Sequence, residues 1–381
     1  MDVFISDISV FLPNAPVEND NIENILGMVH DTPSRTKNII LRNNRIKRRY
    51  YAIDPATGAT THSNAQLAAE AIRALHPYPG FSPDDMTCLC CATSQADQLM
   101  PGHASMVHGE LASRPCEIVS TAGVCVSGMM ALKYAFMNVA QGLHASAVAC
   151  ASELASPTMR GRMSEFSDPP HGDLENNPEL AFNADFLRWM LSDGAGAAYL
   201  TAERPPDRLA LRIDWIEIIS YANEMETCMY MGANKNPDGS LTFWRDSASP
   251  QDIIRDRMLL LQQDVKLLNE KVIPLTVGRP LTSLIQKYGI SGEDFDWFLP
   301  HFSSHYFRQP VYDQMKAVGC EIPDQRWFTN LYEKGNTGSA SIFVIMEELL
   351  HSGRLKAGER ILCYIPESGR FATCFVQLTV V

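Results

Sequence analysis

Short runs of apolar residues alternate with longer amphipathic stretches through most of the chain. In the first half the pattern predicts strands at 2–11, 86–93, 117–120, 145–151 and 196–202, and helices at 63–74 and 103–111. It also predicts a long helix that the turn at 121–128 opens and that runs to about 141. In the second half it predicts strands at 210–220, 297–300, 360–365 and 372–380, an amphipathic helix at 251–273, and helices after His301 and after Asn336. Strands that alternate with helices indicate an α/β layered fold.

The rhythm of strands and helices recurs in the second half, which suggests a divergent duplication. A chain of 381 residues also exceeds the size at which one core usually stops growing. Prolines and charges cluster at 203–207, so we predict two halves, 1–204 and 205–381. Residues 156–183 are rich in proline and polar residues and predict a surface excursion before the strand at 196–202.

Composition excludes several classes of protein. Apolar residues make up 45% of the chain and charged residues 20%, which is typical of a folded globule. A net charge of -12 argues against a general nucleic-acid binder, because such proteins must neutralise phosphates. No apolar run reaches the ~18 residues of a membrane span. The ten cysteines have neither zinc-finger nor redox spacing, which predicts reduced thiols. The N-terminus carries acidic residues where a secretory signal would carry lysines, so we predict a cytoplasmic location.

Cys125 is the first candidate for chemistry. It lies among small residues at a predicted strand-to-helix turn, with Gly123 before it and Gly128 after it. The unpaired amides of a helix N-terminus stabilise negative charge, so this position favours a thiolate. The alternative is a buried structural cysteine, which is the usual state of a free thiol.

His301 directly follows the predicted strand at 297–300. A histidine at a strand end suits a general base, or a hydrogen-bond donor to a thioester carbonyl. It could instead be a satisfied structural histidine, or pair with His305 as metal ligands four residues apart on a helix. No carboxylate lies between the two as in His-Glu-x-x-His, so we predict no metal.

Asn336 lies in a glycine-flanked turn before an apolar helix, where asparagine ordinarily caps the helix. Asp193 opens a glycine-rich turn that runs into a strand, which is the wrong order for a dinucleotide site and indicates a structural role. A cysteine α/β-hydrolase is another interpretation, with Asp193 or Asp296 completing a triad with His301. It is weakened by Ser127, which stands where the nucleophile elbow needs glycine.

The set of Cys125 in its turn, then Pro300-His301, then Gly335-Asn336-Thr337 resembles the β-ketoacyl-[acyl carrier protein] synthase III group of the thiolase superfamily. The segments 151–154 and 192–197 support the resemblance, which extends from Ile5 to Val376. It implies a duplicated thiolase-type five-layered α/β/α/β/α fold, a homodimer and no cofactor.

The resemblance also implies a mechanism. Cys125 would take an acyl group from a thioester, because a thiolate is both a nucleophile and a leaving group. His301 and Asn336 would hold the carbonyl of a malonyl or β-ketoacyl thioester, delivered on acyl carrier protein or coenzyme A. The Cys125 amide and one from the turn at Gly369 would form a second oxyanion hole.

Two departures from the family pattern indicate a specialised-metabolism branch. The usual His-Gln-Ala-Asn is here His301-Phe-Ser-Ser304, and a glycine run is replaced by 366–371. That branch includes ketosynthases that cyclise their products to resorcinols, cyclohexanediones or pyrones. It also includes acyltransferases to a hydroxyl or amine that act without decarboxylation. A non-enzymatic carrier-binding subunit is disfavoured, because Cys125, His301 and Asn336 are all present.

The sequence also predicts roles for Glu153, Met100 and one basic cluster. Glu153 would be an extra base near the substrate, or a solvated or dimer-interface acid. Met100 would line the acyl tunnel across a dimer. The basic cluster would dock an acidic acyl carrier protein, or simply be a solvated face; it consists of Arg42, Arg45, Lys47, Arg48 and Arg49.

Overall fold

The structure is a computed structural model that describes residues 1–29, 31–165 and 186–381. Its centre is a nine-stranded sheet with the strand order β13-β14-β15-β8-β1-β7-β6-β4-β5. The strands are β1 (Phe4–Phe11), β4 (Cys88–Thr93), β5 (Glu117–Ala122), β6 (Ser146–Glu153), β7 (Gly194–Thr201), β8 (Leu211–Ser220), β13 (Trp297–Pro300), β14 (Arg360–Glu367) and β15 (Ala372–Val380). Most of the predicted excursion at 156–183 lies outside the described residues.

The two halves of the sheet have matching strand orders. From the join outward, the first half runs β1-β7-β6-β4-β5 and the second runs β8-β15-β14-β13. They meet through two pairs of residues, Phe4 with Arg212 and Ile5 with Leu211. Beyond β13, an isolated parallel bridge from Phe298 to Trp327 stands where a fifth strand would lie. This repetition confirms the predicted duplication, whereas the boundary at 204/205 stays a prediction.

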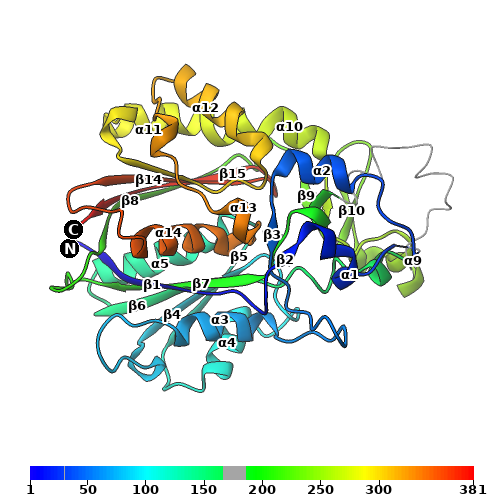
Figure 1. The fold of residues 1–381 in the computed structure, drawn as a ribbon, viewed down its shortest axis with the longest axis horizontal. Coiled ribbons are helices and arrows are strands. Elements are labelled where there is room, and N and C mark those ends of the chain that lie inside the picture. Colours follow the sequence, from blue (N-terminus) through cyan, green and yellow to red (C-terminus); the bar gives the residue numbers. More distant parts are fainter. Residues whose placement is uncertain (30, 166–185) are drawn as a thin grey trace.

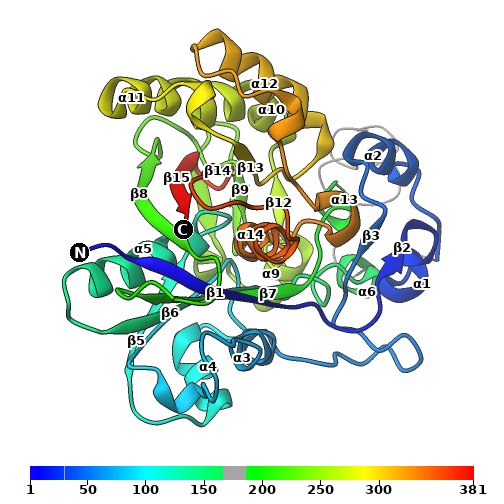
Figure 2. The ribbon, with the colours of Figure 1, turned by 60° about the vertical axis from the view of Figure 1, so that its left-hand side comes forward.

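Helices form three layers around the two half-sheets (Figures 1 and 2). Two helices lie between the half-sheets, α5 (Ser127–Ala140) and α14 (Ser341–His351). One outer layer contains α3 (Asn64–Arg73) and α4 (His103–Leu111), and the other contains α10 (Val265–Ile273), α11 (Arg279–Tyr288) and α12 (Arg308–Ala317). The arrangement confirms the predicted five-layered α/β/α/β/α fold.

Local sequence explains why these elements form. All six residues of β4 are buried, as expected for a strand covered on both faces. Helix α3 begins at a capping box in which Ser63 and Gln66 satisfy each other's backbone amides. The inner helices are apolar around most of their circumference, because α5 and α14 pack against strands of both half-sheets in one core cluster.

The predicted helix at 251–273 is wrong, because the chain breaks it into α9 (Pro250–Arg255) and α10. Arg257 takes a left-handed conformation with φ 57°. Gln262–Gln263 then pairs as β12 with β9 (Met229–Tyr230). Asp264 starts α10 by accepting a hydrogen bond from the N–H of Leu267 at 2.9 Å.

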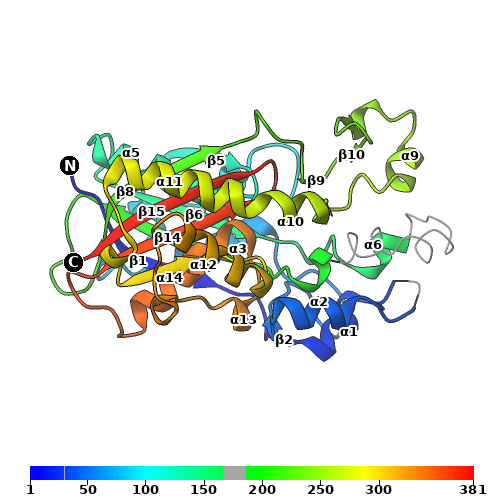
Figure 3. The ribbon, with the colours of Figure 1, turned by 90° about the horizontal axis from the view of Figure 1, so that it is seen from above.

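The helices that were not predicted include α11 and α2 (Lys37–Asn44). The latter belongs to a group of short elements at the end of the molecule opposite both termini (Figure 3). The group includes α1 (Ile22–Leu26), α6 (Gly161–Glu165), α9, β9 and β10 (Ala233–Lys235). None of the helices within the described ranges is long and apolar enough to cross a membrane.

Candidate active site

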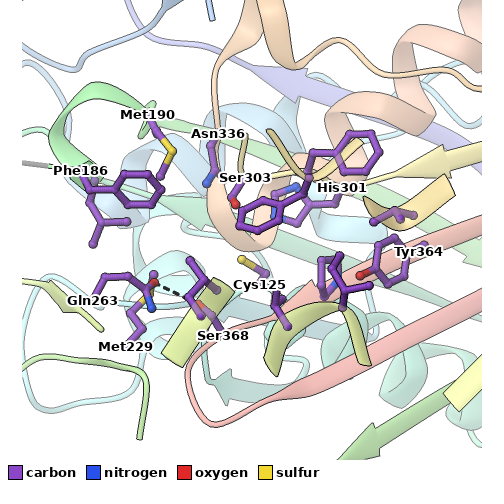
Figure 4. A pocket seen from close by; sticks show the side chains of 18 residues that line it. Cys125, Phe186, Met190, Met229, Gln263, His301, Ser303, Asn336, Tyr364 and Ser368 are labelled. Atoms are coloured by element: carbon purple, nitrogen blue, oxygen red, sulfur yellow. Dashed lines mark hydrogen bonds between the residues drawn. The ribbon is translucent and has the colours of Figure 1, made fainter. Parts of the chain in front are cut away.

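Cys125, His301 and Asn336 line one cavity, although they come from distant parts of the chain. Cys125 lies in the turn between β5 and α5, His301 follows β13, and Asn336 lies in the turn before α14. In Figure 4 the Cys125 sulfur points into the cavity, and the Asn336 amide nitrogen and the His301 ring lie across from it. The cavity encloses about 590 Å³, its open mouth included.

The turn that carries Cys125 is fixed by a buried carboxylate from the other half of the chain. Glu367, the last residue of β14, accepts hydrogen bonds from the N–H groups of Val124 at 3.0 Å and Val126 at 2.9 Å. The Ser127 hydroxyl donates to the Val124 carbonyl at 2.7 Å. The backbone on both sides of the nucleophile is therefore held in place.

Cys125 is uncharged in this setting. Burial raises the pKa of its thiol well above the ordinary value, and the carboxylates of Glu367 and Glu153 raise it further. The thiolate expected from the helix N-terminus is therefore not favoured in the free protein, because desolvation and two acids outweigh the helix amides.

His301 is a neutral imidazole. Its backbone N–H donates to the carbonyl of Tyr364 at 2.8 Å, and the residue is 2% exposed. Burial lowers its pKa to about 4, so at neutral pH it holds no extra proton. A weakly basic imidazole serves better as a hydrogen-bond donor than as a general base, which favours the donor role among those predicted for it.

The alternative metal pair of His301 and His305 is wrong. His301 directly follows strand β13, while His305 begins a separate 3-10 turn, so the two residues are not on one helix. The Nδ1 atom of His305 instead shares a hydrogen bond of 2.6 Å with the Tyr332 hydroxyl.

Asn336 presents a donor to the cavity. Its side-chain oxygen accepts a hydrogen bond from the Gly338 N–H at 2.9 Å, which turns the amide nitrogen toward the cavity (Figure 4). Its backbone bonds to the residues that precede β7: the Asn336 N–H donates to Met190 and its carbonyl accepts from Ser192. The residue is more than a helix cap, because an amide donor faces the thiol.

The carboxylates required by the hydrolase interpretation are engaged elsewhere. Asp193 accepts from the N–H groups of Ala52, Ala155 and Ser156 at 2.7–2.9 Å, which confirms its structural role. Asp296 accepts from the Arg360 N–H at 2.9 Å. Neither orients the His301 ring, so a Cys-His-Asp triad is not assembled.

Most of the remaining cavity wall is apolar, which suits a hydrocarbon chain. The apolar side chains are Phe186, Leu187, Met190, Met229, Leu268, Val272, Ile273, Phe302, Phe307, Val311, Tyr364 and Pro366. Three polar residues also line the cavity and were not predicted from the sequence: Gln263, Ser303 and Ser368. Ser303 and Ser368 could have been found as neighbours of His301 and Gly369, but Gln263 fell inside the wrongly predicted helix.

Comparisons with known proteins agree with this geometry. Residues 285–369 match the family model described as 3-Oxoacyl-[acyl-carrier-protein (ACP)] synthase III C terminal. The β-ketoacyl-[acyl-carrier-protein] synthase III of Methylococcus capsulatus is 23% identical over 353 residues, which cover 92% of this chain and 91% of that protein. The enzyme of the same name from Clostridium perfringens is 23% identical over 356 residues, which cover 93% and 92%. The chain is therefore similar to β-ketoacyl-[acyl-carrier-protein] synthase III enzymes over most of its length.

Solved structures show the same fold. The tetronic acid condensing enzyme AbyA1 superposes with a TM-score of 0.75 at 19% identity, covering 99% of both chains. A cysteine-to-serine variant of Xanthomonas campestris OleA, solved with bound lauric acid and lauroyl-CoA, superposes with a TM-score of 0.74 at 18% identity. That match covers 100% of this synthase III-like chain and 99% of the OleA chain.

Glu153, predicted as an extra base near the substrate, does not line the cavity. It ends β6 and is 7% exposed, so it is not a solvated acid either. Its carboxylate accepts from the N–H and hydroxyl of Ser94 at 3.0 and 2.7 Å, and from those of Ser339 at 3.1 and 2.5 Å. Burial raises its pKa, and these donors oppose that effect. The residue braces the turn before α14.

Gly369 and Met100 occupy different surroundings. A Cβ added to Gly369 would lie 3.0 Å from the Val124 side chain, so the turn after β14 packs directly against the nucleophile turn. The role of Gly369 in an oxyanion hole stays a prediction. Met100 does not contribute to the cavity of this synthase III-like chain and is 82% exposed in the loop before α4.

The basic cluster is smaller than predicted. Arg49 is fully buried and donates to Asn19 at 2.6 Å and to the Trp189 carbonyl at 3.2 Å, so it cannot dock a partner. Lys47 pairs with Glu333 at 3.3 Å, and Arg48 pairs with Glu18 at 2.7 Å. Arg45, exposed at the end of α2, and its exposed neighbour Arg42 are cations without such an acid in the described structure.

One other cluster of potential ligand atoms occurs in the described residues. Atoms of Cys88, Glu117 and His144 lie within 4.8 Å of one another. His144 already shares hydrogen bonds with Glu117 at 2.9 Å and Thr87 at 3.0 Å, and Tyr134 donates to Glu117 at 2.5 Å. These polar contacts account for the grouping.

Proposed function

We propose that this synthase III-like chain is a Claisen condensing enzyme that carries its acyl intermediate on Cys125. The observation that carries the proposal is the convergence of Cys125, His301 and Asn336 on one apolar-walled cavity. The relatives named β-ketoacyl-[acyl-carrier-protein] synthase III support this reaction class.

In the loading step the Cys125 sulfur attacks the carbonyl carbon of an acyl thioester. A new C–S bond forms to Cys125, the donor's C–S bond breaks, and the thiol proton passes to the departing thiolate. The Cys125 amide and one from the Gly369 turn would hold the transient oxyanion.

In the condensing step a malonyl thioester loses carbon dioxide, and the electron pair left behind forms an enolate. His301 and Asn336 donate hydrogen bonds to its oxygen. Two neutral donors stabilise this charge without protonating the carbanion, which fits the lowered pKa of His301. The carbanion attacks the acyl carbonyl, the C–S bond to Cys125 breaks, and the departing thiolate takes up a proton from water. With a β-ketoacyl thioester, the carbanion arises instead when the α-carbon gives up a proton to water, and the proton that Cys125 takes up on leaving balances this loss.

The substrates we propose are an acyl group with a hydrocarbon chain and a second thioester on acyl carrier protein. The twelve apolar residues of the cavity wall support the first choice. The lauric acid and lauroyl-CoA bound to the OleA variant are consistent with it. The fold of the tetronic acid condensing enzyme and the altered segments 301–304 and 366–371 favour a specialised-metabolism enzyme, in which cyclisation follows condensation.

We propose a cytoplasmic homodimer. Strand β5 is the last in the sheet order, and Ile118 on it is exposed. Leu99 and Met100, in the loop before α4, are 79% and 82% exposed, and large apolar side chains of this kind favour association. The mass of the native protein in solution, measured by light scattering, tests this part.

Intact-protein mass spectrometry after brief incubation with acyl-carrier and acyl-coenzyme A thioesters tests the reaction. An increase of one acyl group on the wild type but not on Cys125→Ala is expected, and the best donor identifies the substrate class. Adding malonyl or β-ketoacyl carrier protein then separates condensation from acyl transfer to a hydroxyl or amine, which releases no carbon dioxide. The same adduct on both proteins would refute the role of Cys125.

A further inference from the structure

Glu367 and Glu153 occupy equivalent places in the two halves of the fold. Glu367 is the last residue of β14 and pairs with Ala372, the first residue of β15. Glu153 is the last residue of β6 and pairs with Gly194, the first residue of β7. Both residues are more than nine-tenths buried.

Each carboxylate bonds to the turn that precedes the inner helix of the opposite half. Glu367, from the second half, accepts from Val124 and Val126 before α5. Glu153, from the first half, accepts from the N–H and hydroxyl of Ser339 before α14. The first turn carries Cys125 and the second carries Asn336, so the two crossed contacts fix the nucleophile and a donor of the same cavity.

The two acids also determine the charge around the thiol. Among the described titratable groups, Glu367 acts on Cys125 from β14 and Glu153 from β6, and both raise the pKa of the thiol. His301, which faces the same cavity from β13, is neutral because burial lowers its pKa to about 4. Glu367 has the larger effect of the two acids.

We propose that Glu367 is a positioning residue for Cys125 that holds the nucleophile turn through both flanking amides. Its carboxylate also adds to the effect of burial, which is the main cause of the raised pKa of the Cys125 thiol. This inference rests on the proposed function, in which Cys125 is the nucleophile. A protonated thiol resists the oxidation and alkylation that a thiolate undergoes, so Cys125 is protected in the free enzyme. Ionisation is then coupled to the arrival of a thioester.

Alkylation of Cys125 by iodoacetamide as a function of pH tests this proposal, with the labelled site located by peptide mass. Glu367→Gln retains an oxygen that can accept both amides but removes the charge. We expect its alkylation midpoint to fall by about one pH unit relative to the wild type, and its rate near pH 8 to rise several-fold. Glu153→Gln, the matched control, should shift the midpoint in the same direction by less. An unchanged midpoint in folded Glu367→Gln would overturn the proposal.

A second measurement needs no variant. Hydrogen exchange of the wild-type amides of Val124 and Val126 should be slow, because both are bonded to Glu367. Exchange as fast as in an open loop would contradict the holding role, even if Glu367→Gln did not fold. Neither experiment uses an acyl substrate, so failure of the condensing reaction and failure of this proposal give different results.

Discussion

The side-chain oxygen of Asn336 accepts a hydrogen bond from the N–H of Gly338, two residues further along the chain, at 2.9 Å. This bond decides which end of the amide faces Cys125. With its oxygen engaged, only the NH₂ group can serve an acceptor in the cavity. The turn before α14 therefore does more than start a helix, because it points the Asn336 NH₂ group into the cavity as a hydrogen-bond donor.

Replacement of Asn336 should separate the two steps of the reaction. We expect Asn336→Ala to lose about 10²- to 10³-fold in the rate of condensation, because one donor to the developing oxyanion is removed. Loading of Cys125 should persist. Single-turnover acyl transfer and carbon dioxide release measure the two steps. Asn336→Asp keeps the shape without the donor and should behave like the alanine variant; full condensation by either variant would contradict the role.

Gly338→Ala should disturb the same donor indirectly. Gly338 has φ 52°, and an added Cβ would meet the side chain of Glu153 at 3.0 Å. A non-glycine residue in the left-handed region costs about 1–2 kcal/mol, and the contact would also displace the Asn336 turn. Thermal unfolding and the condensation rate measure the two effects. Gly353→Ala is the control: φ is 72°, but open space surrounds the new Cβ. It should lose stability without a comparable loss of condensation.

Charge reversal tests docking of an acidic carrier. We expect Arg42→Glu with Arg45→Glu to raise KM for carrier-bound acyl groups severalfold at low salt, because local positive charge assists encounter. Loading from a small acyl-coenzyme A should change much less. The matched control is Arg204→Glu with Lys356→Glu, which reverses the same number of charges at two exposed cations that precede β8 and β14. Equal effects of the two changes would indicate a response to net charge rather than a docking face.

Acidification should destabilise the protein through its buried histidines. Burial lowers the pKa of His103 to about 4, against an ordinary value of 6.5. Between these values the unfolded chain binds a proton that the folded chain does not, so stability is present above pH 6.5 and is lost as pH falls toward 4. The contribution is at most about 1.4 kcal/mol per pH unit.

Urea unfolding of the wild type and His103→Gln across this range measures that contribution. The glutamine can still bond to Ser152, which pairs with the histidine ring at 2.9 Å. The wild-type free energy of unfolding should fall more steeply with decreasing pH. Asp193, whose pKa burial raises to about 6, has the opposite dependence, but it is present in both proteins and cancels. Identical slopes would show that His103 is not the responsible group.

The sequence was most informative where one local pattern determines the outcome. The strand β4 was predictable from a short continuous apolar run, and the helix α3 from apolar residues spaced along one face. Cys125, His301 and Asn336 were found because each lies where a strand or turn meets a helix, and their order matches a known family. Glu367 could not be found in this way, because its partner Val126 lies 241 positions earlier in the chain.

The two clearest errors have the same physical origin. Arg49 was predicted on a docking surface from its charge, yet a fully buried guanidinium bonds to Asn19 and to Trp189, 140 positions away. The helix at 251–273 was predicted from apolar spacing, yet Gln262–Gln263 is paired with Met229–Tyr230. In both cases tertiary contacts override a local preference, and these contacts are invisible in a single sequence.

The crossed bonds of Glu153 and Glu367 have a consequence for how the protein can be divided. A fragment ending after β7 would contain Cys125 but not the acid that holds its turn. A fragment beginning at β8 would contain His301 and Asn336 but not the acid that braces Ser339. Neither piece alone holds a complete catalytic centre, so activity should return only when the two fragments are mixed and reassociate.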